Sequence, residues 1–352
     1  MDLLNRKNAF IQLGNFFNSY LDLNESEIYS SQNHELIKFH DLLLNAKHHN
    51  AWFTLKQLKH SLQSWASVLT EEHFSKWLEN YEFNEVSPKK VGIIMAGNIP
   101  LVGFHDFICV SIVGHYLRIK PSSNDSLLLP FIIDFLAEKD AYFKTHIEIK
   151  KERLDDFDAV IATGSNNTSR YFDYYFRNYP SIIRKNRNSI AILEGNETPE
   201  ELEKLGEDMF RYFGLGCRSV SKLYVPEDYD FKPFFEAIYA YSSLLNHHKY
   251  VNNYDYNKAV YLMSQVALLD NNFVILKEDT SLSSPIGCIF YERYKNKKKL
   301  SERLQLQNDD IQCIVSKNEI SFGDVIEFGE TQQPNLWDYA DNINTLAFLL
   351  KI

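Results

Sequence analysis

From Val91 onward, short apolar runs alternate with helical patterns, and this alternation constrains the fold more than any other feature of the chain. Each run ends in a polar or glycine-containing loop. Continuous apolar strands that alternate with helices predict a parallel sheet that is covered on both faces. Such sheets bind ligands at the carboxyl ends of their strands, so the loops after the runs are the first places to search for functional residues.

The same pattern divides the chain into parts. Up to about Glu82, apolar residues recur at three- and four-residue steps, which predicts helices and no strand. We expect a helical N-terminal region and a Rossmann-like cofactor domain over residues 1–195, a catalytic domain over 196–335 and a C-terminal helix over 336–352. The predicted strands are Val91–Met95, Tyr116–Ile119, Ala159–Ile161, Ile190–Leu193, Leu223–Val225, Phe273–Leu276, Ile286–Phe290 and Ile311–Val315.

Composition excludes several functional classes. A chain of 352 residues exceeds the usual size of one hydrophobic core, so two or more packed subdomains are expected. A net charge of -10 argues against a nucleic-acid surface, which needs an excess of Lys and Arg. The basic run from Lys295 to Lys299 is interpreted as a solvated loop or hairpin tip. Four cysteines without CxxC spacing, no signal peptide and no long apolar span predict a protein of the reducing cytoplasm.

One cysteine lies in a glycine-rich turn between a well-signalled helix and an apolar strand. The segment reads Phe213-Gly-Leu-Gly-Cys217-Arg218-Ser-Val220. A thiol attacks carbonyl carbon as the thiolate, which is favoured by unhindered backbone N–H groups and by a nearby cation such as Arg218. The pattern indicates a placed nucleophile. A small buried core residue is the alternative for Cys217, and these residues alone leave it open.

Five short motifs, taken in order, resemble the motif series of the aldehyde dehydrogenase superfamily. Each motif alone is weak, but five in sequence are hard to obtain by chance. The short chain and the Leu101-Val102-Gly103 segment look closest to the LuxC-type acyl-CoA reductases, a fatty-acid reductase family. The resemblance covers roughly residues 90–225 and implies an α/β fold with a doubly wound, parallel-sheet cofactor domain and a second α/β catalytic domain. The motifs are Ala96–Pro100, Lys120–Ser122, Thr163–Ser165, Leu193–Gly195 and Gly214–Cys217.

The resemblance also implies catalytic roles. Cys217 matches the family nucleophile, which attacks the thioester carbonyl and carries the acyl group. Asn98 matches the side-chain amide that stabilises the oxyanion together with the Cys217 backbone N–H. Without that match, an asparagine after a strand is often only a turn residue. Glu194 matches the family's glutamate base, but its spacing to Cys217 is shorter than usual, so its role stays open.

Cofactor contacts follow from the same resemblance. Lys120 matches the lysine that reaches the adenosine ribose, and Gly164 with Ser165 matches the loop that opens a helix beside the cofactor phosphates. Ser123 occupies the place where NAD-preferring relatives tend to carry a glutamate, so a 2'-phosphate is not repelled and we predict NADPH as the cofactor. Ordinary turn or surface residues are the alternatives. The full predicted set is Lys120, Ser122, Ser123, Gly164, Ser165 and Gly195.

Together these expectations describe an NADPH-dependent reductase that converts an acyl-CoA, or a protein-bound acyl thioester, to the aldehyde through acyl-Cys217. An aldehyde-oxidising dehydrogenase and a non-catalytic nucleotide- or acyl-binding relative are the alternatives. The resemblance implies a homo-oligomer and allows an acyl-activating partner protein. No metal is expected, because no histidine has a partner at ligand spacing; those considered were His105, His115, His247 and His248.

Overall fold

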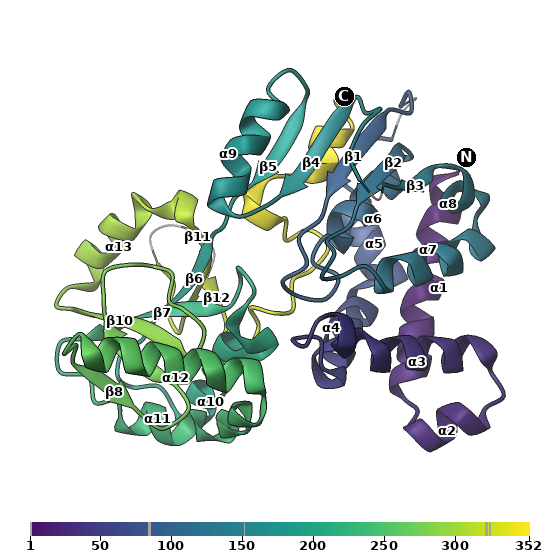
Figure 1. Cartoon of the computed structure of the whole chain (residues 1–352). Helices are drawn as coiled ribbons and strands as arrows, with labels where there is room; N and C mark the ends of the chain where they lie inside the picture. Colours follow the sequence, from purple (N-terminus) through teal and green to yellow (C-terminus); the bar gives the residue numbers. More distant parts are fainter. Residues whose placement is uncertain (1, 84–85, 151, 321–322, 324) are drawn as a thin grey trace. The chain divides into compact units, whose positions relative to one another are not determined.

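The computed structural model describes residues 2–83, 86–150, 152–320, 323 and 325–352. The chain forms two compact units, of which unit 1 comprises Met1–Lys185 with Pro334–Ile352 and unit 2 comprises Asn186–Gln333 (Figure 1). The sequence predicted a division after residue 195. The structure places it earlier, because the strand Asn188–Ile192 pairs in the sheet of unit 2.

Unit 1 begins with the predicted helical region. Its core is rich in aromatic side chains: the ring of Phe10 contacts those of Phe74, Phe104, Phe107 and Phe143. Full burial of one such side chain contributes about 1.5–3 kcal/mol. The helices of this unit are α1 (Leu3–Leu21), α2 (Glu25–Ser30), α3 (His34–His49), α4 (Leu55–Val68), α5 (Glu71–Leu78), α6 (Phe104–Val113), α7 (Leu128–Lys139), α8 (Ala141–Thr145), α9 (Asn166–Tyr175) and α14 (Thr345–Leu349).

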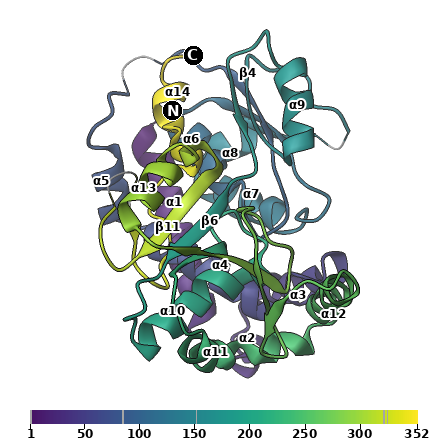
Figure 2. The same ribbon diagram turned by 90° about the vertical axis from the view of Figure 1, so that its left-hand side faces the viewer.

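The sheet of unit 1 has five parallel strands in the order β3-β2-β1-β4-β5. The chain reverses its direction of winding between β1 and β4, so the loops after these two strands border the crevice where such sheets bind ligands. In both views α9 lies beside β4 and β5 (Figure 1, Figure 2). The strands are β1 (Lys90–Ile94), β2 (Tyr116–Lys120), β3 (Ile147–Ile149), β4 (Ala159–Thr163) and β5 (Ser181–Arg184).

The C-terminal segment packs in unit 1, and less of it is helical than the sequence predicted. The helix expected over residues 336–352 is restricted to Thr345–Leu349, preceded by a 3-10 turn at Ala340–Asn342. Arg184 explains the packing. Its guanidinium pairs with the buried Asp106 at 2.6 Å, and it donates to the carbonyl of Ala340 and to the hydroxyl of Thr345. These partners are too far apart in sequence for a local pattern to reveal them.

Unit 2 contains a seven-stranded sheet in the order β12-β11-β6-β7-β10-β9-β8. Every pairing is parallel except that between β8 and β9. Its strands are β6 (Asn188–Ile192), β7 (Val220–Pro226), β8 (Leu268–Asp270), β9 (Ile275–Glu278), β10 (Cys288–Tyr294), β11 (Ile311–Ser316) and β12 (Val325–Ile326). Its α-helices are α10 (Pro199–Phe210), α11 (Lys232–Ile238), α12 (His248–Met263) and α13 (Lys297–Gln305).

The helix α10 connects β6 to β7 and begins where the sequence predicts. Thr198 and Glu201 form a reciprocal capping box, and Pro199 occupies the first helical position. Buried residues such as Leu205 and Met209 face the core of the unit. Because β6, α10 and β7 form a parallel crossover, the residues after β6 and the residues before β7 lie at opposite edges of the sheet.

Candidate active site

Asn98 lies in the loop between β1 and α6, at the carboxyl edge of the unit 1 sheet. Asn98 is exposed. Three residues later, Leu101 adopts the left-handed conformation, with φ of 57°. A non-glycine residue with this backbone conformation is strained by about 1–3 kcal/mol and persists only where its surroundings impose it. The loop is therefore held in one shape by groups around it.

Those groups come from three other segments of unit 1. The backbone N–H of Leu101 donates to the Asp125 carboxylate at 2.7 Å. The Asn50 amide donates to the carbonyl of Gly97 at 3.5 Å, and the Ser61 hydroxyl donates to the carbonyl of Pro100 at 3.3 Å. Burial raises the pKa of the Asp125 carboxyl to about 6, so it is ionised at neutral pH and bonds the N–H as a charged acceptor.

The loop after β2, which carries Ser122 and Ser123, packs directly against the Asn98 loop. A Cβ atom at Gly97 would come within 2.6 Å of the Ser122 Cβ, so only glycine allows this approach. Ser123 is exposed. The amine of Lys120 hydrogen-bonds the carbonyl of Glu152.

Gly164 and Ser165 lie at the start of α9, after β4. The Ser165 hydroxyl accepts from the backbone N–H of Thr168 at 3.3 Å and so caps the helix. The first turn of α9 contains no acidic residue. The loops after β1, β2 and β4 thus lie at the carboxyl ends of parallel strands, around the switch point where such sheets bind ligands.

Cys217 lies in unit 2, in a turn that leads into β7. Three consecutive residues before it, Tyr212, Phe213 and Gly214, have φ angles of 52°, 58° and 76°. The backbone N–H of Ser219 then donates to the carbonyl of Gly216 at 3.0 Å and closes a turn in which Cys217 is the second residue. Cys217 is half-buried, whereas Cys109, Cys288 and Cys313 are buried. Cys217, which the sequence singled out, is thus the most exposed of the four cysteines.

Side chains around this turn fix its backbone. The Ser189 hydroxyl, from β6, donates to the carbonyl of Cys217 at 2.9 Å. The guanidinium of Arg218 donates to the carbonyl of Thr331 and contacts the Cys313 sulfur, both at 3.3 Å. The Nη1 atom of Arg218 is thus directed at Thr331 and Cys313, and its predicted effect on the Cys217 thiolate stays a prediction.

Glu194 and Gly195 follow the carboxyl end of β6, whereas the Cys217 turn lies at the amino ends of β6 and β7. Ser189, at the start of β6, contacts the Cys217 turn, and Glu194 follows the end of the same strand. Glu194 lies five positions after Ser189, and five steps of about 3.3 Å span roughly 16 Å. Geometry within unit 2 therefore argues against Glu194 as a base at the Cys217 thioester, and Gly195 lies at the same distant edge.

The side chain of Glu194 is held by neighbours at that edge. It forms an ion pair with Lys297, and its second oxygen accepts from the Asn318 amide at 2.8 Å. The hydrogen bond from Asn318 and the pairing with Lys297 lower the pKa of Glu194 below its ordinary value. Lys297 is the first residue of α13, so the predicted loop at the basic run is instead the start of a helix.

The histidines that the sequence raised have structural partners. Nε2 of His105 lies 2.8 Å from the carbonyl of Leu336, and Nε2 of His115 lies 2.9 Å from the carbonyl of Leu349. These contacts tie α6 and the second residue after it to the C-terminal segment. His247 caps α12, and the centroid of its ring lies 4.3 Å from that of the Phe213 ring, with the two planes tilted by 33°. Within the described ranges, no group of three or more acidic, His or Cys side chains could hold a metal.

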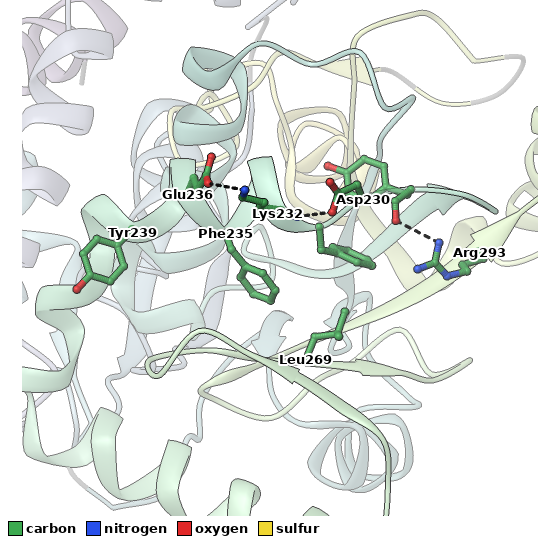
Figure 3. A pocket seen from close by; sticks show the side chains of 9 residues that line it. Asp230, Lys232, Phe235, Glu236, Tyr239, Leu269 and Arg293 are labelled. Carbon is green, nitrogen blue, oxygen red and sulfur yellow. Dashed lines mark hydrogen bonds and ion pairs between the residues drawn. The ribbon is translucent and has the colours of Figure 1, made fainter.

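Unit 2 also contains a pocket of about 690 Å³ beside α11 and β8 (Figure 3). Phe235 and Leu269 contribute apolar side chains to it, and Arg293 donates to the carbonyl of Glu227 at 2.6 Å at its edge. None of the predicted site residues lines this pocket.

Comparison with known families identifies the architecture. The model of the acyl-CoA reductase (LuxC) family matches residues 15–305. The chain belongs to this family. No curated protein sequence matches it. The predicted family resemblance is confirmed, and the family together with the fold supports an oxidoreductase that acts on aldehyde-level groups.

Solved structures that share the fold of this LuxC-family chain include aldehyde dehydrogenases. Aldehyde dehydrogenase 21 from Physcomitrella patens, in complex with the reaction product succinate, matches with a TM-score of 0.69 at 12% identity, over 100% of this chain and 84% of that one. The NAD⁺ complex of an aldehyde dehydrogenase from Bacillus cereus matches with a TM-score of 0.60 at 12% identity, over 90% and 72%. The predicted aldehyde-dehydrogenase-like fold is confirmed.

Sequence reasoning missed the residues that fix the two candidate catalytic segments of this family member. Asp125 and Asn50 hold the Asn98 loop, and Ser189 and Thr331 contact the Cys217 turn. Only Asp125 carried a local signal, since it lies three residues after a matched motif. Among the described residues, no helix is apolar and long enough to cross a membrane.

Proposed function

We propose that this chain is a reductase that converts an acyl thioester to the aldehyde through an acyl group on Cys217. The observation that carries the proposal is that Cys217, in a member of the acyl-CoA reductase family, is half-buried and lies in a turn that follows a left-handed backbone segment. The proposed donor is acyl-CoA. A thioester on an acyl-activating partner protein contains the same reacting bond, and self-association of the chain is proposed from the family resemblance alone.

The chemistry assigns one task to each residue. The Cys217 thiolate attacks the thioester carbon, a carbon–sulfur bond to Cys217 forms, and the donor thiol leaves as its thiolate. The Asn98 amide and the Cys217 backbone N–H donate to the oxyanion. A nicotinamide cofactor, when bound, supplies a hydride to the acyl carbon. The resulting thiohemiacetal oxyanion collapses to aldehyde and returns Cys217 as thiolate, and the departed donor thiolate takes up the one proton that balances the reaction.

NADPH is the proposed cofactor. Ser123 is exposed and places no carboxylate where a 2'-phosphate would be repelled. Asp125, the nearest acid in that loop, bonds the N–H of Leu101. Lys120, Ser122, Gly164 and Ser165 are proposed as the cofactor contacts. Catalytic efficiency with NADH equal to or better than that with NADPH would refute this preference.

The position of Glu194 favours the reductive direction over aldehyde oxidation. An oxidising enzyme needs a base that activates water to hydrolyse the acyl-enzyme. Glu194 lies at the sheet edge opposite Cys217 and is paired with Lys297, so it is not proposed as that base.

The direct test is the intact mass of the protein after incubation with a long-chain acyl-CoA in the absence of cofactor. We expect a hydroxylamine-labile acyl adduct on the wild type that Cys217→Ala lacks and that NADPH discharges as aldehyde. Cys288→Ala is the matched control, since it removes a buried thiol of the same unit, and it should still be acylated. Absence of an adduct with every acyl-CoA, or an adduct on Cys217→Ala, would refute the proposal.

A further inference from the structure

A buried polar network lies behind the Cys217 turn, and the proposed chemistry has not used it. At its centre is Asp208 of α10, whose side chain is fully buried. Its carboxylate accepts three hydrogen bonds: from the N–H of Gly329 at 2.7 Å, from the N–H of Thr331 at 3.0 Å and from the Thr331 hydroxyl at 2.8 Å. Thr331 is fully buried as well. Asp208 therefore fixes the backbone of residues 329–331.

Burial raises the pKa of Asp208 to about 6, although the hydrogen bonds from Gly329 and Thr331 act in the opposite direction. The group is thus a carboxylate at neutral pH. Desolvating a carboxylate costs several kcal/mol unless donors satisfy it, and three donors converge on this one. Such a group tolerates few alternative positions of its partners, so it specifies the geometry of the segment it binds.

From Thr331 and Gln332 the network reaches the turn. The carbonyl of Thr331 accepts from the Arg218 guanidinium at 3.3 Å. The Gln332 amide donates to the Thr331 hydroxyl at 3.3 Å and to the Ser219 hydroxyl at 3.5 Å. Arg218 and Ser219 are the two residues that directly follow Cys217.

A second anchor lies on the other side of the thiol. Ser189 donates to the Cys217 carbonyl at 2.9 Å, and both Ser189 and Ser219 are buried. The turn is therefore bonded at Cys217 itself, at Arg218 and at Ser219, by groups from β6 and from residues 331–332.

We propose that Asp208 and Thr331 are positioning residues for Cys217: they fix the segment that holds the turn, and so set the direction from which the thiolate meets the thioester carbon. This inference rests on the proposed function. It matters for rate, because displacing a reacting atom by about 1 Å can cost roughly 100-fold.

The test compares Thr331→Val with Thr331→Ser. Valine keeps the shape of the side chain but removes the hydroxyl that bonds Asp208 and Gln332, whereas serine keeps that hydroxyl. Three quantities are measured: the rate of Cys217 acylation at saturating acyl-CoA by intact mass, the half-saturating acyl-CoA concentration, and the rate of Cys217 alkylation by iodoacetamide. Thermal unfolding establishes the folded fraction of each variant.

We expect Thr331→Val to slow acylation of the folded protein about 10- to 100-fold and Thr331→Ser less than about 3-fold, with half-saturation unchanged. Alkylation by iodoacetamide, a small reagent that approaches from many directions, should change by less than about 3-fold. Asp208→Asn should slow acylation as Thr331→Val does, because an amide nitrogen would face a donor. If Asp208→Asn does not fold, the comparison of Thr331→Val with Thr331→Ser decides the test.

Two outcomes would overturn the inference, and they are distinguishable. If the wild type is acylated and folded Thr331→Val is acylated within about 3-fold of its rate, the network is only structural and the proposed function stands. If the wild type forms no acyl-Cys217, the proposed function fails and the inference fails with it.

Discussion

The Asn98 loop of unit 1 and the Cys217 turn of unit 2 are held in place by different physical means. Side chains from three separate segments bond the backbone of the Asn98 loop, and a single residue of that loop, Leu101, is left-handed. Before Cys217, three successive residues are left-handed, and one of them is glycine. Groups from elsewhere in the chain anchor both segments, but the Cys217 turn also follows a run of left-handed backbone that the Asn98 loop lacks.

This difference has consequences for how each segment responds to substitution. Strained backbone persists only where the surrounding structure imposes it, so changes near Cys217 should affect stability and chemistry together. The Asn98 loop contains one such residue, Leu101, so we expect the loss of its hydrogen-bond acceptor Asp125 to have a smaller effect.

The largest effect is expected for Asn98→Ala. Removing one oxyanion donor typically costs about 100- to 1,000-fold in rate, so acylation of Cys217 should slow by that factor. Single-turnover intact-mass kinetics with acyl-CoA measure it. The thermal midpoint should stay close to that of the wild type, because the residue is exposed. Acylation within about 3-fold of the wild-type rate would show that Asn98 is only a turn residue.

Gly214→Ala should affect stability and acylation together. Gly214 has φ of 76°, and a Cβ atom there would lie 3.2 Å from the Met209 carbonyl oxygen. We expect a loss of about 1–2 kcal/mol in the free energy of unfolding, measured with urea. Acylation should slow about 10- to 100-fold, because the thiol is displaced.

Gly114→Ala is the matched control for Gly214→Ala. Gly114 caps the end of α6 with φ of 96° and belongs to neither the Asn98 loop nor the Cys217 turn. It should lose stability to a similar extent and keep its rate of acylation. Equal loss of acylation in both glycine variants would contradict the assigned role of the turn.

Asp125→Ala is expected to slow acylation about 10-fold, less than Asn98→Ala, because the Asn98 amide remains and only its position is loosened. Asp125→Asn keeps an oxygen that can accept from Leu101, so it should recover most of the rate. Rapid-quench acylation assays compare the two variants. If asparagine is as slow as alanine, the hydrogen bond to Leu101 is not what positions the loop.

Glu194→Gln should have the smallest effect, less than about 3-fold on acylation and on aldehyde formation. Asn318 and Lys297 lower the pKa of Glu194, so the carboxylate stays charged above the ordinary glutamate range. Its contribution to stability is present there and is lost only as the pH falls below that range. Acylation measured from pH 6 to 9 should therefore follow the same profile in variant and wild type, and removal of a limb of that profile by the substitution would restore Glu194 as a base.

Local sequence patterns predicted many of the helices and strands. Apolar runs ended by polar loops predicted eight of the twelve strands among the described residues but missed β3, β5, β8 and β12, and the capping box at Thr198 predicted the start of α10. The separation of Glu194 from the Cys217 turn was predictable as well. In a parallel β6–α10–β7 crossover, the residue after β6 and the turn before β7 lie at opposite ends of the strands. Matching the order of motifs alone overlooked this geometry.

Other features depend on partners that are distant in sequence, so no local pattern could reveal them. Lys297 pairs with Glu194 across 103 positions. The C-terminal segment has helical spacing, yet Asp341 and Asn342 are left-handed and its carbonyl at Ala340 bonds Arg184. The anchors of the Cys217 turn likewise come from Ser189 and Thr331, on either side of it in the chain.

The most direct test of the central claim is to quantify the products formed from a long-chain acyl-CoA and NADPH: fatty aldehyde and free acid by gas chromatography with mass spectrometry, CoA thiol with a thiol reagent, and NADP⁺ by the loss of NADPH absorbance. We predict fatty aldehyde, CoA thiol and NADP⁺ in equal amounts with the wild type, and none of them with Cys217→Ala. Free fatty acid released without consumption of NADPH, or equal turnover by Cys217→Ala, would contradict the account.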